Sequence, residues 1–238
     1  MEYSLYPLGD NAVIIELGKE IDMKTQQRIQ VIASCLDENP FPWIIEYIPA
    51  FTTITILYNP VHPSLSGDNF SLPFEKVCYH LERLLPTISL GKSSESRVVD
   101  IPVCYGGEYG PDLEYVAEIN KLTTDEVIQI HSAGDYIVYM IGFAPGFPYV
   151  GGMSEKIAAP RRESPRLKIP ARTVGIAGMQ TGVYPIETPG GWQLIGQTPI
   201  ELFRPDENPP SLLRAGDKIR FTPISQKEYL KWEKDERC

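Results

Sequence analysis

Apolar residues in the first ninety positions follow two different spacings. Four runs are rich in the β-branched and aromatic side chains that strands prefer: residues 3–8, 12–17, 43–48 and 52–58. Two other stretches repeat apolar residues at helical spacing, one from Asp22, a capping residue, to the stop at Asn39-Pro40, and one that opens at residues 72–75. The resulting order, ββαββα, predicts a small sheet with helices on one face.

The pattern changes after residues 90–96, a polar stretch of small residues that we interpret as an interdomain linker. A strand is predicted directly after it, at residues 97–103. Two short helices are predicted next, at residues 111–119 and 127–132, and a capping box at residues 123–126 precedes the second helix.

Glycine and proline dominate the chain beyond residue 140, where twelve of the 22 prolines and eleven of the 19 glycines lie. That density excludes long helices. Short β-rich runs stand between the turns, at residues 174–178, 183–187, 193–196, 200–203 and 218–222. We expect an antiparallel β barrel or sandwich followed by a charged helix at residues 225–237. The whole pattern predicts an α+β protein of two domains, residues 1–92 and 97–238.

Composition narrows the classes of function. The 238 residues include 22 Lys+Arg and 31 Asp+Glu, and the net charge of −9 argues against nucleic acid as a partner, because phosphate binding needs a basic face. No apolar run approaches the roughly 18 residues that span a bilayer, and the N-terminus lacks the basic region of a signal peptide. We therefore expect a cytoplasmic protein with no membrane partner. Three histidines and four cysteines are too scattered to predict a metal site or a redox pair.

An aromatic segment at residues 142–152, GFAPGFPYVGG, is the first candidate for chemistry. Phe143, Phe147 and Tyr149 stand among glycines and prolines, so we expect an irregular segment whose backbone amides are free for a ligand or for turns. The competing interpretation is a rigid structural loop whose aromatic side chains complete the core. Spacing alone leaves both interpretations open.

Five cations follow within twelve residues of this acidic chain: Arg161, Arg162, Arg166, Lys168 and Arg172. Such a local excess predicts a site for a carboxylate or phosphate, since arginine offers bidentate donors. The alternative is a solvated surface that nearby acids balance.

Polar side chains near these segments could supply further groups for a site. Gln180, Tyr184 and Gln193 carry hydrogen-bonding ends on short strands, as a pocket that orients an amide or carboxylate requires. His131 ends the capped helix, where it could act as a general acid or base, or alternatively as a capping or packing group.

Several long motifs resemble one family, in the same order and along nearly the whole chain. They are LGDNAVIIELG, GFAPGFPYVGG, PRRESPRLKIPARTVGIAG and MQTGVYPIETPGGWQLIGQTPIELF. At these positions the chain resembles the B subunit of bacterial 5-oxoprolinase. This group is also called allophanate hydrolase subunit 1, and it includes the KipI-like sporulation kinase inhibitors. The resemblance implies an N-terminal α+β domain and a C-terminal cyclophilin-like β barrel, in agreement with the patterns above.

The resemblance also implies a reaction. A three-subunit enzyme, of which this chain would be one part beside the A and C subunits, opens 5-oxoproline to L-glutamate with ATP. This chain would help to shape, with the C subunit, the site in which the activated intermediate is hydrolysed. ATP is expected at a partner subunit, because this chain carries no nucleotide motif, and no metal site is expected in it. The isolated chain is expected to have no activity.

The family motifs, carried onto this sequence, also imply site residues. His131 and Arg172 are candidates for catalysis. The candidates for substrate binding are Phe143, Phe147, Arg161, Gln180, Tyr184 and Trp192. We expect Arg161 and Arg172 to hold a carboxylate or phosphoryl anion. Gln180 and Tyr184 would hydrogen-bond the lactam or its product, and His131 would move a proton.

The resemblance leaves a regulatory function open. KipI-like members are described as binding a sporulation histidine kinase and blocking its autophosphorylation, and a KipA-like relative of the C subunit relieves the block. A cyclophilin-like groove lined by Phe143, Phe147 and Trp192 would suit a proline-containing segment. A third possibility is an assembly scaffold for the C subunit. The chain can be both an enzyme subunit and a kinase inhibitor. A related amide such as allophanate is an alternative substrate.

Overall fold

The computed structural model describes residues 2–66, 72–88 and 97–235 of the chain. The chain divides into two compact units, Met1–Glu95 and Ser96–Cys238. The predicted linker, residues 90–96, lies outside the described residues. The domain limits predicted from the sequence therefore stay a prediction.

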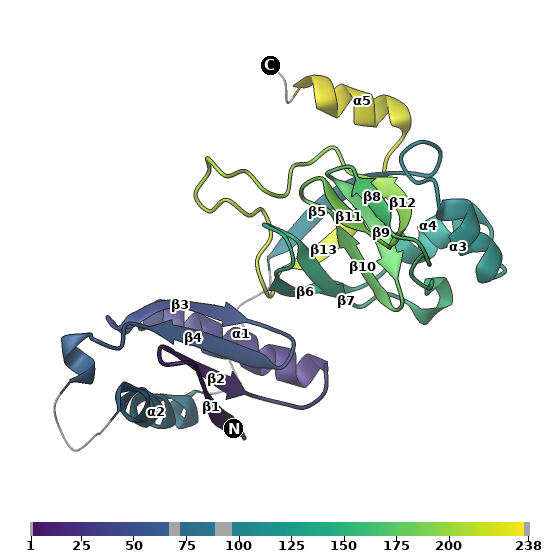
Figure 1. The fold of residues 1–238 in the computed structure, drawn as a ribbon. Helices are drawn as coiled ribbons and strands as arrows, with labels where there is room; N and C mark the ends of the chain where they lie inside the picture. Colours follow the sequence, from purple (N-terminus) through teal and green to yellow (C-terminus); the bar gives the residue numbers. More distant parts are fainter. Residues whose placement is uncertain (1, 67–71, 89–96, 236–238) are drawn as a thin grey trace. The chain divides into compact units, whose positions relative to one another are not determined.

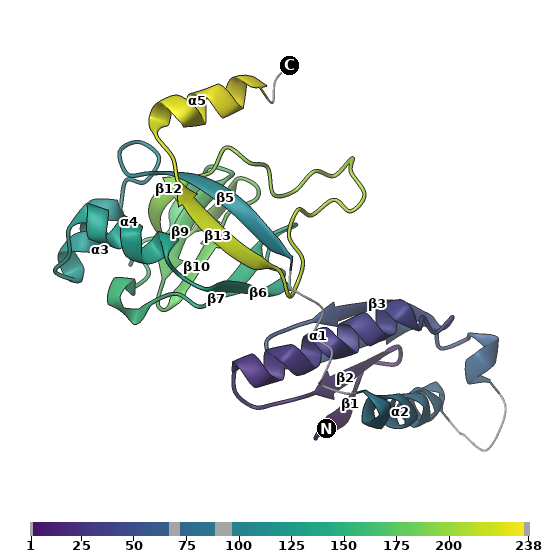
Figure 2. The same cartoon turned by 180° about the vertical axis from the view of Figure 1, so that it is seen from behind.

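The N-terminal unit has the predicted ββαββα order (Figure 1). Its elements are β1 (Ser4–Leu8), β2 (Ala12–Glu16), α1 (Met23–Glu38), β3 (Ile44–Pro49), β4 (Thr53–Tyr58) and α2 (Pro73–Leu84), with short 3-10 turns at Pro63–Leu65 and Leu85–Thr87. The strands form an antiparallel sheet in the order β1-β2-β4-β3. Helix α1 lies along one face of this sheet (Figure 2).

The first helix begins and ends where the sequence predicts. The Asp22 side chain accepts a hydrogen bond from the backbone N–H of Thr25 at 2.7 Å, which satisfies one of the free amides of the first turn. Ile29, Ile32 and Leu36 recur along the buried stripe of the helix and belong to the core of this unit. Burial of this stripe, rather than helix propensity, supplies most of the stability of such a helix.

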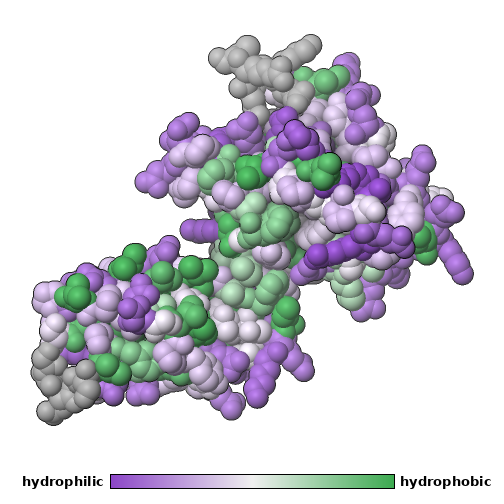
Figure 3. All heavy atoms as spheres, viewed as in Figure 1, coloured by the Kyte–Doolittle hydropathy of each residue, from purple (hydrophilic) through white to green (hydrophobic). Residues whose placement is uncertain are grey.

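The opposite face of the same sheet carries an exposed row of mainly apolar residues. Tyr6, Ile14, Thr55 and Ile48 form one row across the four strands, because directly opposed residues of antiparallel strands share a face. Tyr6 and Ile48 are 48% and 41% exposed, and Leu8 is exposed beside them. Figure 3 shows hydrophobic residues gathered over this unit. An exposed apolar patch of this kind is typical of a protein contact surface.

The C-terminal unit is built around a closed barrel of seven strands in the order β10-β7-β6-β13-β5-β12-β9. Its strands are β5 (Val98–Tyr105), β6 (Tyr136–Ile141), β7 (Pro148–Gly151), β8 (Arg166–Ile169), β9 (Thr173–Ala177), β10 (Gln180–Val183), β11 (Thr188–Gly190), β12 (Gln193–Gln197) and β13 (Lys218–Pro223). Strands β8 and β11 form a separate two-stranded sheet. The helices are α3 (Leu113–Ile119), α4 (Thr124–Ser132) and α5 (Gln226–Asp235), and a 3-10 turn lies at Glu155–Ile157. The predicted fold class, α+β with a β barrel, is confirmed.

Several details of the predicted barrel differ from the structure. Strand β13 runs parallel to β5, whereas a wholly antiparallel barrel was expected. Part of the aromatic segment expected to be irregular forms β7, because its backbone pairs with β6 on one side and β10 on the other. The predicted strand at residues 183–187 is wrong, since β10 ends at Val183 and Pro185 has no backbone N–H to donate. The run at residues 200–203 makes only an isolated bridge.

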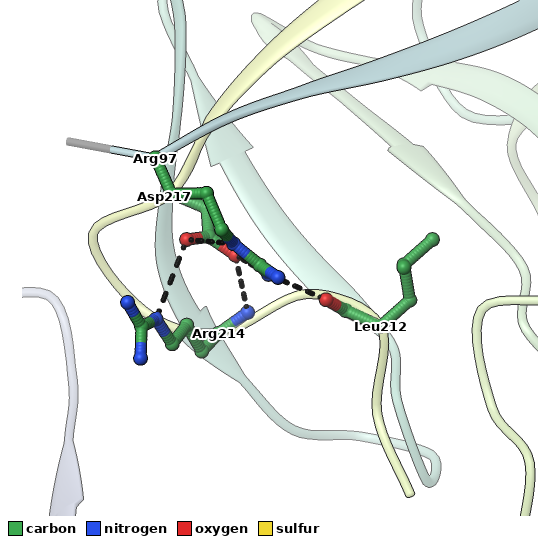
Figure 4. A network of polar contacts seen from close by, with 4 residues as sticks. All are labelled: Arg97, Leu212, Arg214 and Asp217. Carbon is green, nitrogen blue, oxygen red and sulfur yellow. Dashed lines mark hydrogen bonds and ion pairs between the residues drawn. The ribbon is translucent and has the colours of Figure 1, made fainter. Parts of the chain in front are cut away.

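A buried carboxylate fixes the starts of the two parallel strands. Asp217, directly before β13, accepts hydrogen bonds from Arg97 Nε at 3.1 Å and from the backbone N–H of Arg214 at 2.9 Å (Figure 4). Arg97, directly before β5, also donates to the Leu212 carbonyl oxygen at 2.6 Å. The hydrogen bond to Asp217 raises the pKa of Arg97. Charge-assisted bonds of this kind hold β5 and β13 in register at this end of the barrel.

No helix in the described part of the chain is long and apolar enough to cross a bilayer. Residues 2–66, 72–88 and 97–235 bring together no group of three or more His, Cys, Asp or Glu side chains that could hold a metal ion. Cys35, Cys78 and Cys104 are free thiols.

Candidate functional site

Five aromatic side chains, which we call the aromatic cluster, gather beside the barrel: Phe143, Phe147, Tyr149, Tyr184 and Trp192. The ring of Phe147 lies at the centre, with centroids 5.4 Å from Phe143 and Tyr149, 5.5 Å from Tyr184 and 5.7 Å from Trp192. All four pairs are edge-to-face, the arrangement that aromatic quadrupoles favour. Four of the predicted site residues are therefore brought together, although they come from segments about 40 residues apart.

A tight turn presents the first rings of the cluster. Gly142 donates its backbone N–H to the Phe147 carbonyl at 3.0 Å, and the Phe147 N–H donates to Ala144 at 3.0 Å. Gly146 has a φ of +76°, and a Cβ there would lie 2.9 Å from the Cβ of Phe203. Glycine is needed at this position both for the left-handed backbone and for the close approach.

Phe143 occupies the same left-handed region without being glycine. Its φ is +68° and its side chain is 67% exposed, so packing of the side chain offsets little of the free-energy cost of this backbone conformation. We expect Phe143→Gly to raise the free energy of unfolding of the barrel unit by about 0.5–1 kcal/mol. Glycine relieves the strain of the left-handed backbone, and this gain exceeds the cost of the greater freedom that glycine gives the unfolded chain. A urea titration of the full chain measures this.

Lys121 offers a matched control for that substitution. It is exposed and also has a positive φ, of +57°, but it follows α3 rather than the turn before β7. Lys121→Gly should stabilise by a similar amount, whereas Tyr115→Gly within α3 should destabilise by about 1 kcal/mol. A loss of stability in Phe143→Gly would show that the exposed ring contributes more packing than its exposure indicates.

The predicted basic segment is largely paired with acids. Arg166 Nη2 lies 2.8 Å and Arg162 Nη1 lies 3.4 Å from Asp112 Oδ1, and Lys168 pairs with Glu187 at 2.9 Å. Arg161 is exposed and has no acidic partner within the residues that the structure describes. Three of the five cations thus lie beside acids, as the alternative interpretation expects, and the anion site stays a prediction.

Arg172 and Gln180 lie at two edges of this region. Arg172 has a φ of +68°, its backbone N–H donates to the Tyr184 carbonyl, and its Nη1 donates to the Pro199 carbonyl at 3.0 Å. It thereby ties together three chain segments. Gln180 starts β10 opposite Ala177, a member of the small core that contains Tyr184 and Trp192.

The Tyr184 hydroxyl lies at the polar side of the aromatic cluster. Burial raises the pKa of Tyr184 to about 12, and the nearby charge of Arg161, the backbone N–H of Trp192 and the charge of Arg166 act in the opposite direction. Because its pKa is raised, the hydroxyl keeps its proton at neutral pH. The hydroxyl can therefore serve as a neutral donor near the charges of Arg161 and Arg166.

His131 lies apart from this arrangement, inside the barrel. Its side chain is 0% exposed, Nδ1 lies 2.7 Å from the Tyr105 hydroxyl and Nε2 lies 2.9 Å from Thr181 Oγ1. Thr181 Oγ1 donates in turn to the Gly175 carbonyl at 3.0 Å, so His131 carries its proton on Nε2 and accepts from Tyr105 at Nδ1. Burial lowers its pKa to about 3.

Strand β10 separates His131 from the aromatic cluster. Thr181 points into the barrel, whereas the next residue, Gly182, faces Trp192 and Phe147, because successive strand residues point to opposite sides. This geometry favours the packing role that the sequence left open for His131. Its predicted role in proton transfer stays a prediction, for which an experiment is given in the Discussion.

Two polar residues of this region were not among the predicted site residues. Asp112 lies inside the helix predicted at residues 111–119, whereas in the structure it directly precedes α3 and its side chain makes no capping bond. Thr181 gave no signal, since a threonine within a β-rich run is common. Gln193, which the sequence suggested for a pocket, donates instead to the Pro160 carbonyl at 2.9 Å and holds the basic segment.

Comparison with known proteins identifies the family. The family described as the carboxyltransferase domain, subdomain C and D, matches residues 3–213. The B subunit of 5-oxoprolinase from Bacillus subtilis (strain 168) is 54% identical over 99% of this chain and 98% of its own length. The B subunit of 5-oxoprolinase from Escherichia coli O157:H7 is 45% identical over 94% of this chain and 96% of its own length.

A solved structure shares the fold. The crystal structure of TTHA0988 superposes with a TM-score of 0.76 at 32% identity, covering 90% of this chain and 40% of that longer chain. The matching part of TTHA0988 thus has the same fold within a longer chain. On the profile match and on the identity to these full-length relatives, the chain belongs to the family of 5-oxoprolinase B subunits.

Proposed function

We propose that this chain is the B subunit of an ATP-dependent 5-oxoprolinase, which opens 5-oxoproline to L-glutamate together with the A and C subunits. The observation that carries this proposal is the 54% identity, over nearly the full length of both chains, to a protein of that name. Water adds across the lactam C–N bond in this reaction. ATP is proposed to act at a partner subunit, and the isolated chain is proposed to be inactive.

The aromatic cluster and its polar side supply a suitable surface for such a substrate. A flat five-membered lactam suits the exposed ring of Phe143, and the buried rings of Phe147 and Trp192 would support it from behind. Arg161, exposed and without an acidic partner in the described residues, would attract the carboxylate. Tyr184 and Gln180 would hydrogen-bond the lactam, and Arg172 would complete the anion contact.

Partner subunits are part of the proposal. The relatives are named as one subunit of an enzyme, and the apolar outer face of the N-terminal sheet, with Tyr6, Leu8 and Ile48 exposed, is suited to contact with another protein. We further propose a cytoplasmic location, where 5-oxoproline and ATP are both available.

The test is ATP-dependent glutamate release from 5-oxoproline by the purified A and C subunits, with and without this chain. We expect turnover to require the chain and to vanish when ATP is omitted. An unrelated acidic protein at the same concentration serves as the control. Equal turnover without the chain would refute the proposal, and the autophosphorylation assay of a sporulation histidine kinase would then test the KipI-like alternative.

A further inference from the structure

Asp112 organises the basic segment from inside the protein. Its carboxylate is 8% exposed, Oδ2 accepts the backbone N–H of Leu194 at 2.7 Å, and the backbone N–H of Asp112 donates back to Leu194 at 2.9 Å. Oδ1 receives Arg166 Nη2 at 2.8 Å and Arg162 Nη1 at 3.4 Å. One buried negative charge thus holds two guanidinium groups, which leaves a local excess of positive charge.

Arg166 keeps an unused donor. Its Nη1 is buried and has no hydrogen-bond partner in the described residues. Buried polar nitrogens in proteins almost always have a partner, and an unsatisfied one is unfavourable, more so on a charged group. The side chain as a whole is 24% exposed, so the guanidinium lies at the edge of the protein rather than deep in its core. These features are expected of a group that meets its acceptor on another molecule.

The pairing of two short strands places Arg166 beside the aromatic cluster. Arg166 lies opposite Gly190 in the β8–β11 sheet, and a Cβ on Gly190 would come within 2.6 Å of the Tyr184 hydroxyl oxygen. The backbone N–H of Arg162 donates to the Gly191 carbonyl at 2.8 Å, which holds the same loop. Arg166, the Tyr184 hydroxyl and the amide of Trp192 therefore adjoin one short loop, residues 190–192.

We infer that Arg166 is a carboxylate-binding residue of this site and that Asp112 is its positioning residue. This inference rests on the proposed function for the identity of the substrate. The substrate carboxylate would accept from the Arg166 guanidinium, whose side chain is 24% exposed, and the lactam ring would lie over the loop at residues 190–192, next to Trp192. Arg166 suits this role better than Arg172, because Arg172 Nη1 already donates to the Pro199 carbonyl.

The three tryptophans of the chain allow a direct binding test. Trp192 lies in the aromatic cluster, whereas Trp43 is in the N-terminal core and Trp232 is in α5, so the last two are internal references. The full chain is labelled with 5-fluorotryptophan and titrated with 5-oxoproline or with 2-pyrrolidinone, which lacks the carboxylate. In the wild type, 5-oxoproline should shift the fluorine resonance of Trp192 at concentrations about tenfold lower than 2-pyrrolidinone does.

Substitutions then assign the preference to Arg166. Arg166→Gln should abolish this preference of about tenfold, and Asp112→Asn should reduce it, because the guanidinium loses its charged anchor. Lys168→Gln removes the same charge from the same strand, from an exposed residue paired with Glu187, and should keep the preference. If Arg166→Gln does not fold, Arg166→Lys tests the same point, since it keeps the charge but loses the planar fork and should lower the preference.

A kinetic readout separates binding from folding. In the assembly with the A and C subunits, Arg166→Gln should raise the KM for 5-oxoproline about tenfold with little change in kcat, whereas Lys168→Gln should change neither. A retained carboxylate preference in Arg166→Gln, or no response of Trp192 in a wild-type chain that supports turnover, would overturn the inference and leave the proposed function intact. Turnover that does not need the chain would overturn the proposed function, and the Trp192 titration would still decide on Arg166.

Discussion

Replacing Phe147 by alanine is expected to lower the free energy of unfolding of the barrel unit by about 3–5 kcal/mol, the usual cost of removing a buried phenylalanine ring. The ring is 2% exposed and contacts the other four members of the aromatic cluster. Its removal leaves a cavity. The neighbouring rings cannot move to fill it, because Phe147 directly precedes β7, and the backbone of β7 is paired with β10. Urea unfolding of the full chain, followed by near-ultraviolet circular dichroism, measures the change.

Phe143→Ala is the control for this prediction. It removes the same ring chemistry from the same turn, but at a position that is 67% exposed and has a positive φ in both variants. We expect a loss of less than about 1 kcal/mol. If Phe147→Ala cost no more than Phe143→Ala, Phe147 would not be the centre of the aromatic cluster.

Acidification should destabilise the barrel unit through His131. Burial lowers the pKa of this histidine to about 3, so between the ordinary pKa near 6.5 and pH 3 the unfolded chain binds a proton that the folded chain does not. The contribution of His131 is therefore fully present above pH 6.5 and is lost as the pH falls. The loss should approach about 1.4 kcal/mol per pH unit below pH 6.

The measurement compares urea unfolding of the wild type and His131→Gln between pH 4 and pH 8. Glutamine keeps a donor and an acceptor but does not titrate, so the difference between the two proteins should carry this slope and flatten above pH 6.5. Tyr105→Phe removes the donor to Nδ1 and should cost about 1–3 kcal/mol at every pH without changing the slope. A slope that His131→Gln does not alter would contradict the prediction.

The variant His131→Gln also tests the predicted role of His131 in proton transfer. A general acid or base that acts near neutral pH shapes the pH profile of turnover. A histidine that is 0% exposed and stays neutral in the folded chain down to about pH 3 should not. We therefore expect the assembly with His131→Gln to keep the wild-type profile, and a lost basic or acidic limb would restore the catalytic interpretation.

Local patterns were enough to predict the N-terminal unit. Asp22 caps α1 and Asn39 ends it as the sequence indicates, and the alternation in β4 predicts which of its side chains are buried. These signals are local, because a helix cap and the period of a strand depend on residues a few positions apart. The order ββαββα follows from them.

Strands of the barrel were harder to predict. β7 and β8 have four residues each and β11 has three, too few for a period to be recognised, and β7 and β11 lie among glycines and prolines. Such strands exist because distant partners satisfy their backbone groups. The parallel pairing of β5 with β13, more than 110 residues apart, depends on the same closure of the barrel.

For the candidate site, the residue types, the family resemblance, and the excess of cations and aromatic rings in two segments could be read from the sequence. The contacts among Phe147, Tyr184 and Trp192, the separation of His131 from them by β10, and the pairing of Asp112 with Arg166 became apparent only in the folded chain. The type of a side chain is a property of one position in the sequence. Contact, burial and charge pairing arise when barrel closure brings segments tens of residues apart to within hydrogen-bonding distance.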